Sequence, residues 1–232
     1  MNSLPATGFL WFLAFLFSTT VHEAMHAFVA WKGGDPTAYH GGQVSLSPLP
    51  HIKREPVGML VVPFLTSLTQ GWAMGWASAP YDPEWALRYP RRAAVMAAAG
   101  PAGNLAIALS ALALMKAGLA LGWFMPPQTA NFDLLVEATI PAAGFAATAL
   151  SILLVMNVFL AMFNLLPLPP LDGFSVLGIM LPERYAAPLQ GFHSNGATSM
   201  VGLVVAWQVF PVFTDPLFSL LLKLVHPGES YS

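Results

Sequence analysis

Long apolar runs separated by short polar stretches dominate this chain. A helix needs about 20 mostly apolar residues to cross the hydrocarbon core of a bilayer. Four stretches reach that length, and we predict membrane-spanning helices over residues 8–31, 93–123, 142–166 and 198–225. Pro211 and Pro216 interrupt the fourth stretch, so we expect that helix to be kinked or split.

The region 33–78 follows a different pattern. Its segment 59–76 is apolar, but proline and glycine break it and polar residues occupy its middle. We expect this segment to be a short span or a re-entrant segment packed against protein. Residues 43–47 alternate between polar and apolar after two glycines, which predicts a strand or a small β-hairpin. The apolar segment 174–181 is too short to cross a membrane alone.

Composition excludes a soluble domain. Of the 232 residues, 56% are hydrophobic and only 9% are charged, whereas soluble domains carry about 25% charged residues. The chain has no cysteine, which excludes disulfides and thiolate metal sites, and its net charge of −2 without a basic run argues against nucleic-acid binding. We therefore predict an all-α polytopic membrane protein with about four to six transmembrane helices. Residues 1–232 would form one integral-membrane domain, with a core over about 8–182 and a C-terminal helical segment over about 198–225.

The basic residues indicate an orientation in the membrane. They follow the first predicted span and precede the second, whereas residues 126–141 contain no lysine or arginine. Because basic loops stay on the cytoplasmic side, we expect residues 32–58 and 78–92 in the cytoplasm and 126–141 outside. Both basic stretches can share one side if 59–76 dips into the membrane and returns, which favours the re-entrant interpretation.

The first predicted span contains the most informative residues. His22, Glu23 and His26 form the pattern H-E-x-x-H, although charged groups inside a span cost roughly 2.5–3.5 kcal/mol each. Residues four apart on a helix lie about 40° and about 6 Å from each other, so both imidazoles can bind one metal ion. Glu23 would then act as the base for a water on that metal. The alternative is a pair of core histidines with an ion-paired glutamate.

Two histidines do not complete a hydrolytic zinc site, which normally has three protein ligands. Asp172 is the candidate third ligand, because it is a lone carboxylate after a proline-rich stretch, 167–170, that we expect to be extended. The alternative is that Asp172 caps a helix in a water-exposed turn. Counting residues from the basic loops places His22 and Asn104 at one depth, and the proline stretch could bring Asp172 to that layer.

Three motifs together resemble one family. They are His22-Glu23-x-x-His26, Gly100-Pro-Ala-Gly-Asn104, and Asn164-x-x-Pro-x-Pro-x-Leu-Asp172-Gly. The chain resembles the site-2 protease family of intramembrane zinc metalloproteases, in particular its compact bacterial branch without PDZ or CBS domains, over about residues 18–182. It departs from the branch at Ser47, Lys53 and residues 78–80, which leaves the roles of His51 and of the re-entrant region open.

The resemblance implies a set of roles. His22, His26 and Asp172 would hold one Zn²⁺ per chain, and Glu23 would be the general base. The segment from Gly100 to Asn104 would line the active site, with Asn104 catalytic in holding substrate or the oxyanion. Gly100 and Asn164 would support substrate or oxyanion as well.

The function predicted from these residues is hydrolysis of peptide bonds in membrane-embedded substrates. The partners would be the lipid bilayer and a transmembrane protein or peptide, held as an extended strand against residues 43–47. The protein would sit in a bacterial inner membrane with its active site toward the cytoplasm. Two alternatives stay open at this point: a metal-binding transporter or sensor without protease activity, and a catalytically silent relative.

Overall fold

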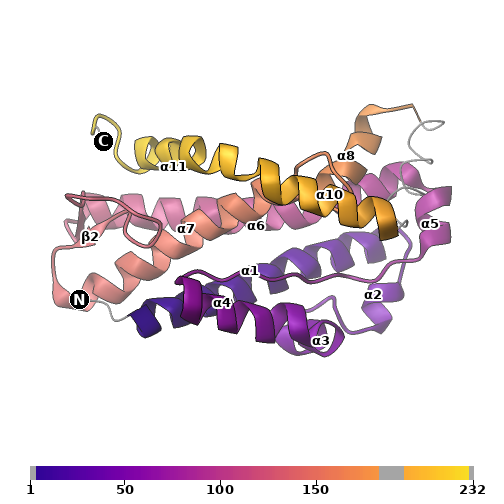
Figure 1. Cartoon of the computed structure of the whole chain (residues 1–232), viewed down its shortest axis with the longest axis horizontal. Coiled ribbons are helices and arrows are strands. Elements are labelled where there is room, and N and C mark those ends of the chain that lie inside the picture. The colour runs from indigo at the N-terminus through magenta and orange to yellow at the C-terminus, as the bar shows by residue number, and fades with distance from the viewer. Residues whose placement is uncertain (1–3, 183–195, 230–232) are drawn as a thin grey trace.

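Three long helices form the body of the molecule (Figure 1). In the computed structural model, which describes residues 4–182 and 196–229, these are α1 (Leu4–Lys32), α6 (Pro90–Ala120) and α7 (Gly144–Asn164). All three are long and apolar enough to cross a membrane. The predicted all-α membrane fold is therefore confirmed.

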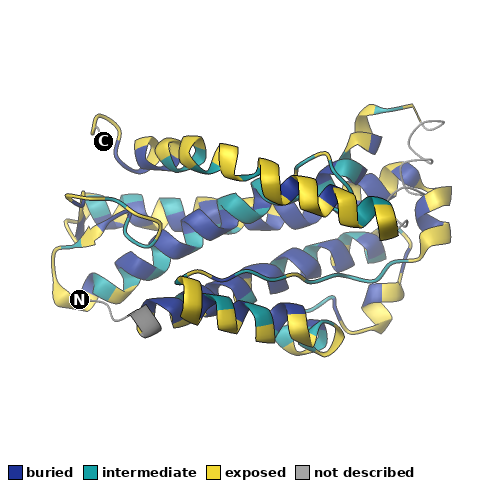
Figure 2. Cartoon of the chain, in the orientation of Figure 1, coloured by how far each residue is buried: buried dark blue, intermediate teal, exposed yellow. Residues whose placement is uncertain are grey.

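A bent pair of helices supplies the fourth predicted span. Helices α10 (Gly196–Val209) and α11 (Pro211–Val225) meet at 52°, because Pro211 has no N–H to continue the hydrogen-bond ladder. The predicted break is thus confirmed. Counting the pair as one span gives four in the described residues, the lower end of the predicted range. The pair lies along α7 with its outer face largely exposed (Figure 2).

Helix α6 is the central element, packed against α1, α7 and the short helix α8 (Asp172–Met180). Alanine and glycine on α6 allow close approach, as expected where helices pack in a membrane. The main core lies toward the ends of α6 and α7 that are remote from α8, and includes the fully buried Met115, Ile152 and Val155.

The segment 57–82 folds back on itself. A π-helical turn, η1 (Val57–Val61), leads into α4 (Val62–Gln70). Gly71 ends that helix in the left-handed region at φ 78°, and residues 72–82 return without regular structure along α4 and α1 (Figure 1). The backbone N–H of Trp76 donates to the Gly58 carbonyl at 3.1 Å. The segment is thus a hairpin with one helical limb and one return limb, not a straight crossing.

The small β-element lies elsewhere than predicted. Strands β1 (Phe124–Met125) and β2 (Glu137–Ala138) form an antiparallel pair, with Phe124 opposite Ala138. The prediction of a strand over 43–47 is wrong, because these residues form bends. The Ser45 hydroxyl accepts from the Ser47 N–H at 3.1 Å, and this local bond replaces a strand ladder.

Short helices complete the chain. Helices α2 (Thr37–His40), α3 (Pro48–Arg54) and α5 (Pro83–Arg88) lie toward the same end of the long helices as α8, and the sheet lies at the other end (Figure 1). A 3-10 turn, η2 (Pro141–Ala143), precedes α7. The buried Asp35 joins the start of α2 to the end of the return limb. Its carboxylate accepts from the N–H of Thr37 at 2.9 Å and from the N–H of Asp82 at 2.8 Å.

The hairpin turn yields a stability prediction. Replacing Gly71 by alanine should lower the free energy of unfolding by about 1–2 kcal/mol, because a Cβ disfavours the left-handed region. Gly144→Ala is the matched control: Gly144 has φ −60° and open space around it, so alanine should be neutral or stabilising. Thermal unfolding in detergent compares the two variants, and equal melting temperatures would contradict the strain assigned to Gly71.

Candidate metal centre

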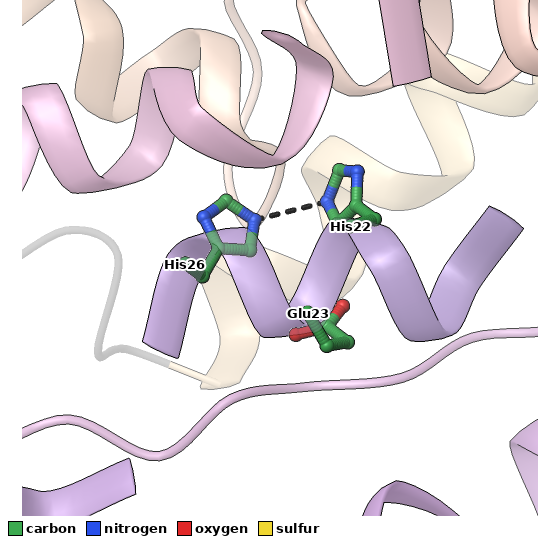
Figure 3. A group of neighbouring side chains, drawn as sticks. All are labelled: His22, Glu23 and His26. Carbon is green, nitrogen blue, oxygen red and sulfur yellow. Dashed lines mark hydrogen bonds between the residues drawn. The ribbon is translucent and has the colours of Figure 1, made fainter. Parts of the chain in front are cut away.

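Two imidazoles on α1 face each other. His22 and His26 project from the same side of the helix, one turn apart (Figure 3). Their Nε2 atoms are 2.9 Å apart, and both side chains are buried. The spacing of the H-E-x-x-H pattern thus brings both nitrogens to one point.

Asp172 reaches the same point from the start of α8. Its Oδ2 lies 3.2 Å from His22 Nε2 and 3.4 Å from His26 Nε2. The N-cap position of α8 is Leu171 and Asp172 is the first residue of the helix, so Asp172 is not the helix cap of the alternative interpretation. The preceding prolines do not form an extended stretch as predicted. They form tight turns in which the N–H of Leu171 donates to the Leu168 carbonyl at 2.9 Å.

A buried polar network determines which nitrogen of His22 carries the proton. The Asn157 amide donates to the Leu153 carbonyl and to the Ser18 hydroxyl, so Asn157 Oδ1 is left to accept. It accepts from Asn104 Nδ2 at 2.9 Å. Asn104 therefore presents its oxygen to His22 Nδ1 at 2.6 Å. Because that oxygen can only accept, Nδ1 is protonated and Nε2 carries a lone pair.

His26 has the same arrangement. Its Nδ1 lies 2.8 Å from the backbone carbonyl oxygen of Met96 on α6, which can only accept. Its Nε2 therefore also carries a lone pair. Metal-binding histidines typically donate their other N–H to a carbonyl in this way, which orients the ring.

These three ligand atoms fit a divalent metal ion. Two imidazole lone pairs and a carboxylate oxygen converge, and Asp172 Oδ2 has no hydrogen-bond donor among the described residues. A tetrahedral zinc site with bonds of about 2.0–2.2 Å separates its ligand atoms by about 3.3 Å. The observed separations of 2.9, 3.2 and 3.4 Å are close to that value. Without a cation, three electron-rich atoms at this distance would repel one another.

Glu23 lies beside the two imidazoles and could itself offer a carboxylate oxygen to a metal ion. Its carboxylate is buried, and one of its oxygens lies within 4.8 Å of a ring nitrogen of each histidine. In Figure 3 it leaves α1 on a different side from the imidazoles.

A cavity of about 170 Å³ with both polar and apolar lining opens onto these groups. It lies between α1, α6, α8 and the return limb of the hairpin, and its lining includes Glu23, Ser78, Tyr81, Asn164 and Asp172. Burial raises the pKa of the Tyr81 phenol above its ordinary value, so this side chain stays a neutral hydrogen-bond donor at neutral pH.

The structure separates the two asparagines that were expected to support the substrate. Asn104 is fully buried and does not line the cavity, because its amide is used between His22, Asn157 and the Ser18 carbonyl. The contact of Asn104 with substrate or oxyanion stays a prediction, and in this structure its amide is bonded to other protein groups. Asn164 does line the cavity, with its Nδ2 donating to the Leu160 carbonyl at 2.9 Å.

Gly100 lies directly behind the metal ligands. A Cβ added there would overlap His26 Nε2 and would lie 2.6 Å from His22 Nε2. The residue thus lets the backbone of α6 pass close to both imidazoles, and it does not line the cavity.

Sequence reasoning missed Asn157, Ser78 and Tyr81. An asparagine in the middle of the apolar run 152–163 is a signal for Asn157, since polar groups inside a span usually have a partner there. Ser78 and Tyr81 carry no such signal, because only the return of the hairpin brings them to the cavity. His51 is buried in α3, where its Nε2 lies 3.1 Å from the Ser45 carbonyl, and it does not line the cavity.

Comparison with known proteins finds bacterial relatives over most of the chain. The protein named "Putative zinc metalloprotease YwhC" of Bacillus subtilis is 29% identical over 223 residues, which are 93% of this chain and 92% of that protein. Proteins named "Putative zinc metalloprotease Rip2" are 30% identical over 162 residues in Mycolicibacterium smegmatis and 32% identical over 180 residues in Mycobacterium tuberculosis. The chain spans 53% and 60% of those two proteins. No protein-family model and no solved structure matches the chain.

These names support a zinc metalloprotease. They agree with the donor set of two imidazoles and one carboxylate, which suits zinc.

The close approach of Gly100 gives a test of the metal site. Gly100→Ala should reduce zinc affinity by a factor of about 10–100 or more, because the new Cβ displaces both ligand nitrogens. Gly103→Ala on the same helix is the control, since its Cβ would meet the flexible Met25 side chain at 3.0 Å and no metal ligand. Zinc titration against a chelating dye in detergent measures both, and an unchanged affinity of Gly100→Ala would contradict the position of the site.

Proposed function

We propose that this chain is an intramembrane zinc metalloprotease of the site-2 protease family, which hydrolyses a peptide bond in a membrane-embedded substrate. One observation carries the proposal: His22, His26 and Asp172 converge between apolar helices, and the buried Glu23 lies beside them. The relatives' names support the same chemistry.

The three ligands would come from two parts of the chain. His22 and His26 would bind through Nε2 and Asp172 through Oδ2, each in its observed orientation. Zinc bound there would lower the pKa of a water molecule to about 7 and polarise the carbonyl of the scissile bond. Asn104 and the Met96 carbonyl would hold the two imidazoles in place.

Glu23 would transfer the proton. Its carboxylate would accept a proton from the attacking water and then deliver it to the nitrogen of the leaving amine. Its burial keeps bulk water from competing for that proton. Asn164 would stabilise the negative charge that develops on the carbonyl oxygen, because its amide lines the cavity and has a second N–H beyond the one bonded to Leu160.

The substrate would bind as an extended strand against the return limb of the hairpin. Residues 77–79 line the cavity, and none of them forms a backbone hydrogen bond to another described residue. Free backbone groups of this kind can pair with an added strand. We assign to 77–79 the substrate-pairing edge that the sequence had indicated at 43–47.

An apolar cavity next to the metal centre suits a membrane-embedded substrate. It has a volume of about 110 Å³ and is lined by aromatic side chains that include Trp72, Phe163 and Trp207. It shares the return limb and α7 with the metal cavity. The apolar part of a substrate segment would rest there while its unwound part reaches the metal centre.

The membrane would be bacterial, and the metal centre would open toward the cytoplasm. Lysine and arginine side chains occupy the loops and helix ends at the α2, α3 and α5 end of the molecule. The positive-inside rule assigns that end to the cytoplasm, and the bacterial relatives fit an inner membrane.

The role of Glu23 gives the decisive test. Glu23→Gln should retain zinc, since Glu23 is not a ligand in the proposal, but should cleave a single-span test peptide about 10²–10⁴ times more slowly. His22→Ala should lose both zinc and cleavage. Zinc analysis and product mass spectrometry on the full chain in detergent measure the two properties.

An exposed glutamate provides the control. Glu84 lies on α5 outside the cavity, so Glu84→Gln should behave like the wild type. Undiminished cleavage by Glu23→Gln would reject Glu23 as base. Zinc binding with metal transport and no proteolysis by the wild type would favour a transporter or sensor instead.

A further inference from the structure

We propose that Glu55 is a positioning residue that acts through Ser78. By holding residues 77–79 in a fixed position beside the metal cavity, it would fix the alignment of the substrate strand with this segment and so select which peptide bond is cleaved. The proposal rests on the proposed function. It concerns two side chains that are neither metal ligands nor the general base.

The contacts to Ser78 come from the end of α3. The Ser78 hydroxyl donates to Glu55 Oε1 at 2.8 Å and accepts from Arg54 Nε at 3.2 Å. A hydroxyl has one donor and two acceptor positions, so this pair of bonds defines its rotation. Both partners carry charge, and hydrogen bonds to charged groups are about twice as strong as those between neutral groups.

This contact lies at the point where the return limb passes the metal cavity. Trp76 is bound to Gly58 just before it, and Asp82 is bound to Asp35 after it. Between these two attachments, the Ser78 side chain ties the limb to the end of α3. Residues 77–79 line the same cavity as Glu23 and Asp172, so a shift of the limb moves the backbone that faces the metal centre.

The neighbours of Ser78 favour a short, well-defined edge. Successive side chains of an extended segment point to opposite faces. With Ser78 turned toward Glu55, an extended segment would turn Ala77 and Ala79 to the opposite face, and their side chains are small. Pro80 follows and has no N–H to offer. A partner strand therefore has three residues with which to pair.

An edge of three residues determines the register of a paired substrate strand only weakly unless the edge itself is held in place. A strand that slips by two residues keeps the same side-chain face and nearly the same hydrogen bonds, whereas a slip of one residue reverses the face. Loosening the 77–79 segment should therefore produce additional cleavage two residues from the main position. A defect in folding or metal binding would lower the rate without creating such products.

The experiment uses the full chain and a single-span test peptide in vesicles of phosphatidylcholine and phosphatidylglycerol. Ser78→Ala and Glu55→Ala should each retain zinc, lose about tenfold in kcat/KM, and yield products offset by two residues in mass spectrometry. The double variant should be no worse than either single variant, since both remove one interaction. Ser78→Thr and Glu55→Gln retain the hydroxyl and the acceptor and should restore the single cleavage position.

Controls separate this inference from the proposed function. Glu84→Ala removes an exposed carboxylate on α5 and keeps the backbone N–H that donates to the capping Asp82 side chain, and it should leave rate and position unchanged. A wild type that does not cleave refutes the proposed function itself. A different outcome is that the wild type cleaves in a Glu23-dependent way while Ser78→Ala and Glu55→Ala still cut at a single position. That result, whatever the cleavage rate of the two variants, overturns the role given to Glu55.

Discussion

The structure depends on one electrostatic constraint: three electron-rich atoms, His22 Nε2, His26 Nε2 and Asp172 Oδ2, converge in a buried place. Burying such groups without a counter-charge is costly, since water no longer screens them. A divalent cation would remove the repulsion and would join α1 to the start of α8. The proline-rich turns after α7 bring the Asp172 carboxylate to the two imidazoles.

Helix α6 supports this centre from behind. Its Gly100 lets the backbone approach the imidazoles, its Met96 carbonyl orients His26, and its Asn104 orients His22. Asn157 on α7 in turn determines which way the Asn104 amide faces. The polar groups inside the helices thus form one connected network, which is how buried polar groups become tolerable. The return limb of the hairpin forms another wall of the cavity. In the proposed function its backbone groups would pair with a substrate.

Much of this arrangement was predictable from the sequence. The rest could not be predicted, and the reasons are physical. Apolar length and the i, i+4 spacing of His22 and His26 are local properties, so the long helices and the shared face could be predicted. The strand expected at 43–47 failed because serine side chains bond to their own backbone, which a period of two does not reveal. Asn104 was placed in the active site by resemblance, whereas its partners come from 53 and 86 residues away. Ser78 reaches the cavity only through the fold of the hairpin.

X-ray absorption at the zinc edge of the zinc-loaded full chain tests the central claim most directly. A centre formed by His22, His26 and Asp172 predicts scattering from two imidazole rings, with nitrogen and oxygen neighbours at about 2.0–2.2 Å. In Asp172→Ala the two imidazoles should remain while one oxygen neighbour is lost or replaced by water. A first shell with fewer than two imidazoles in the wild type, or an unchanged zinc affinity and spectrum in Asp172→Ala, would contradict the account.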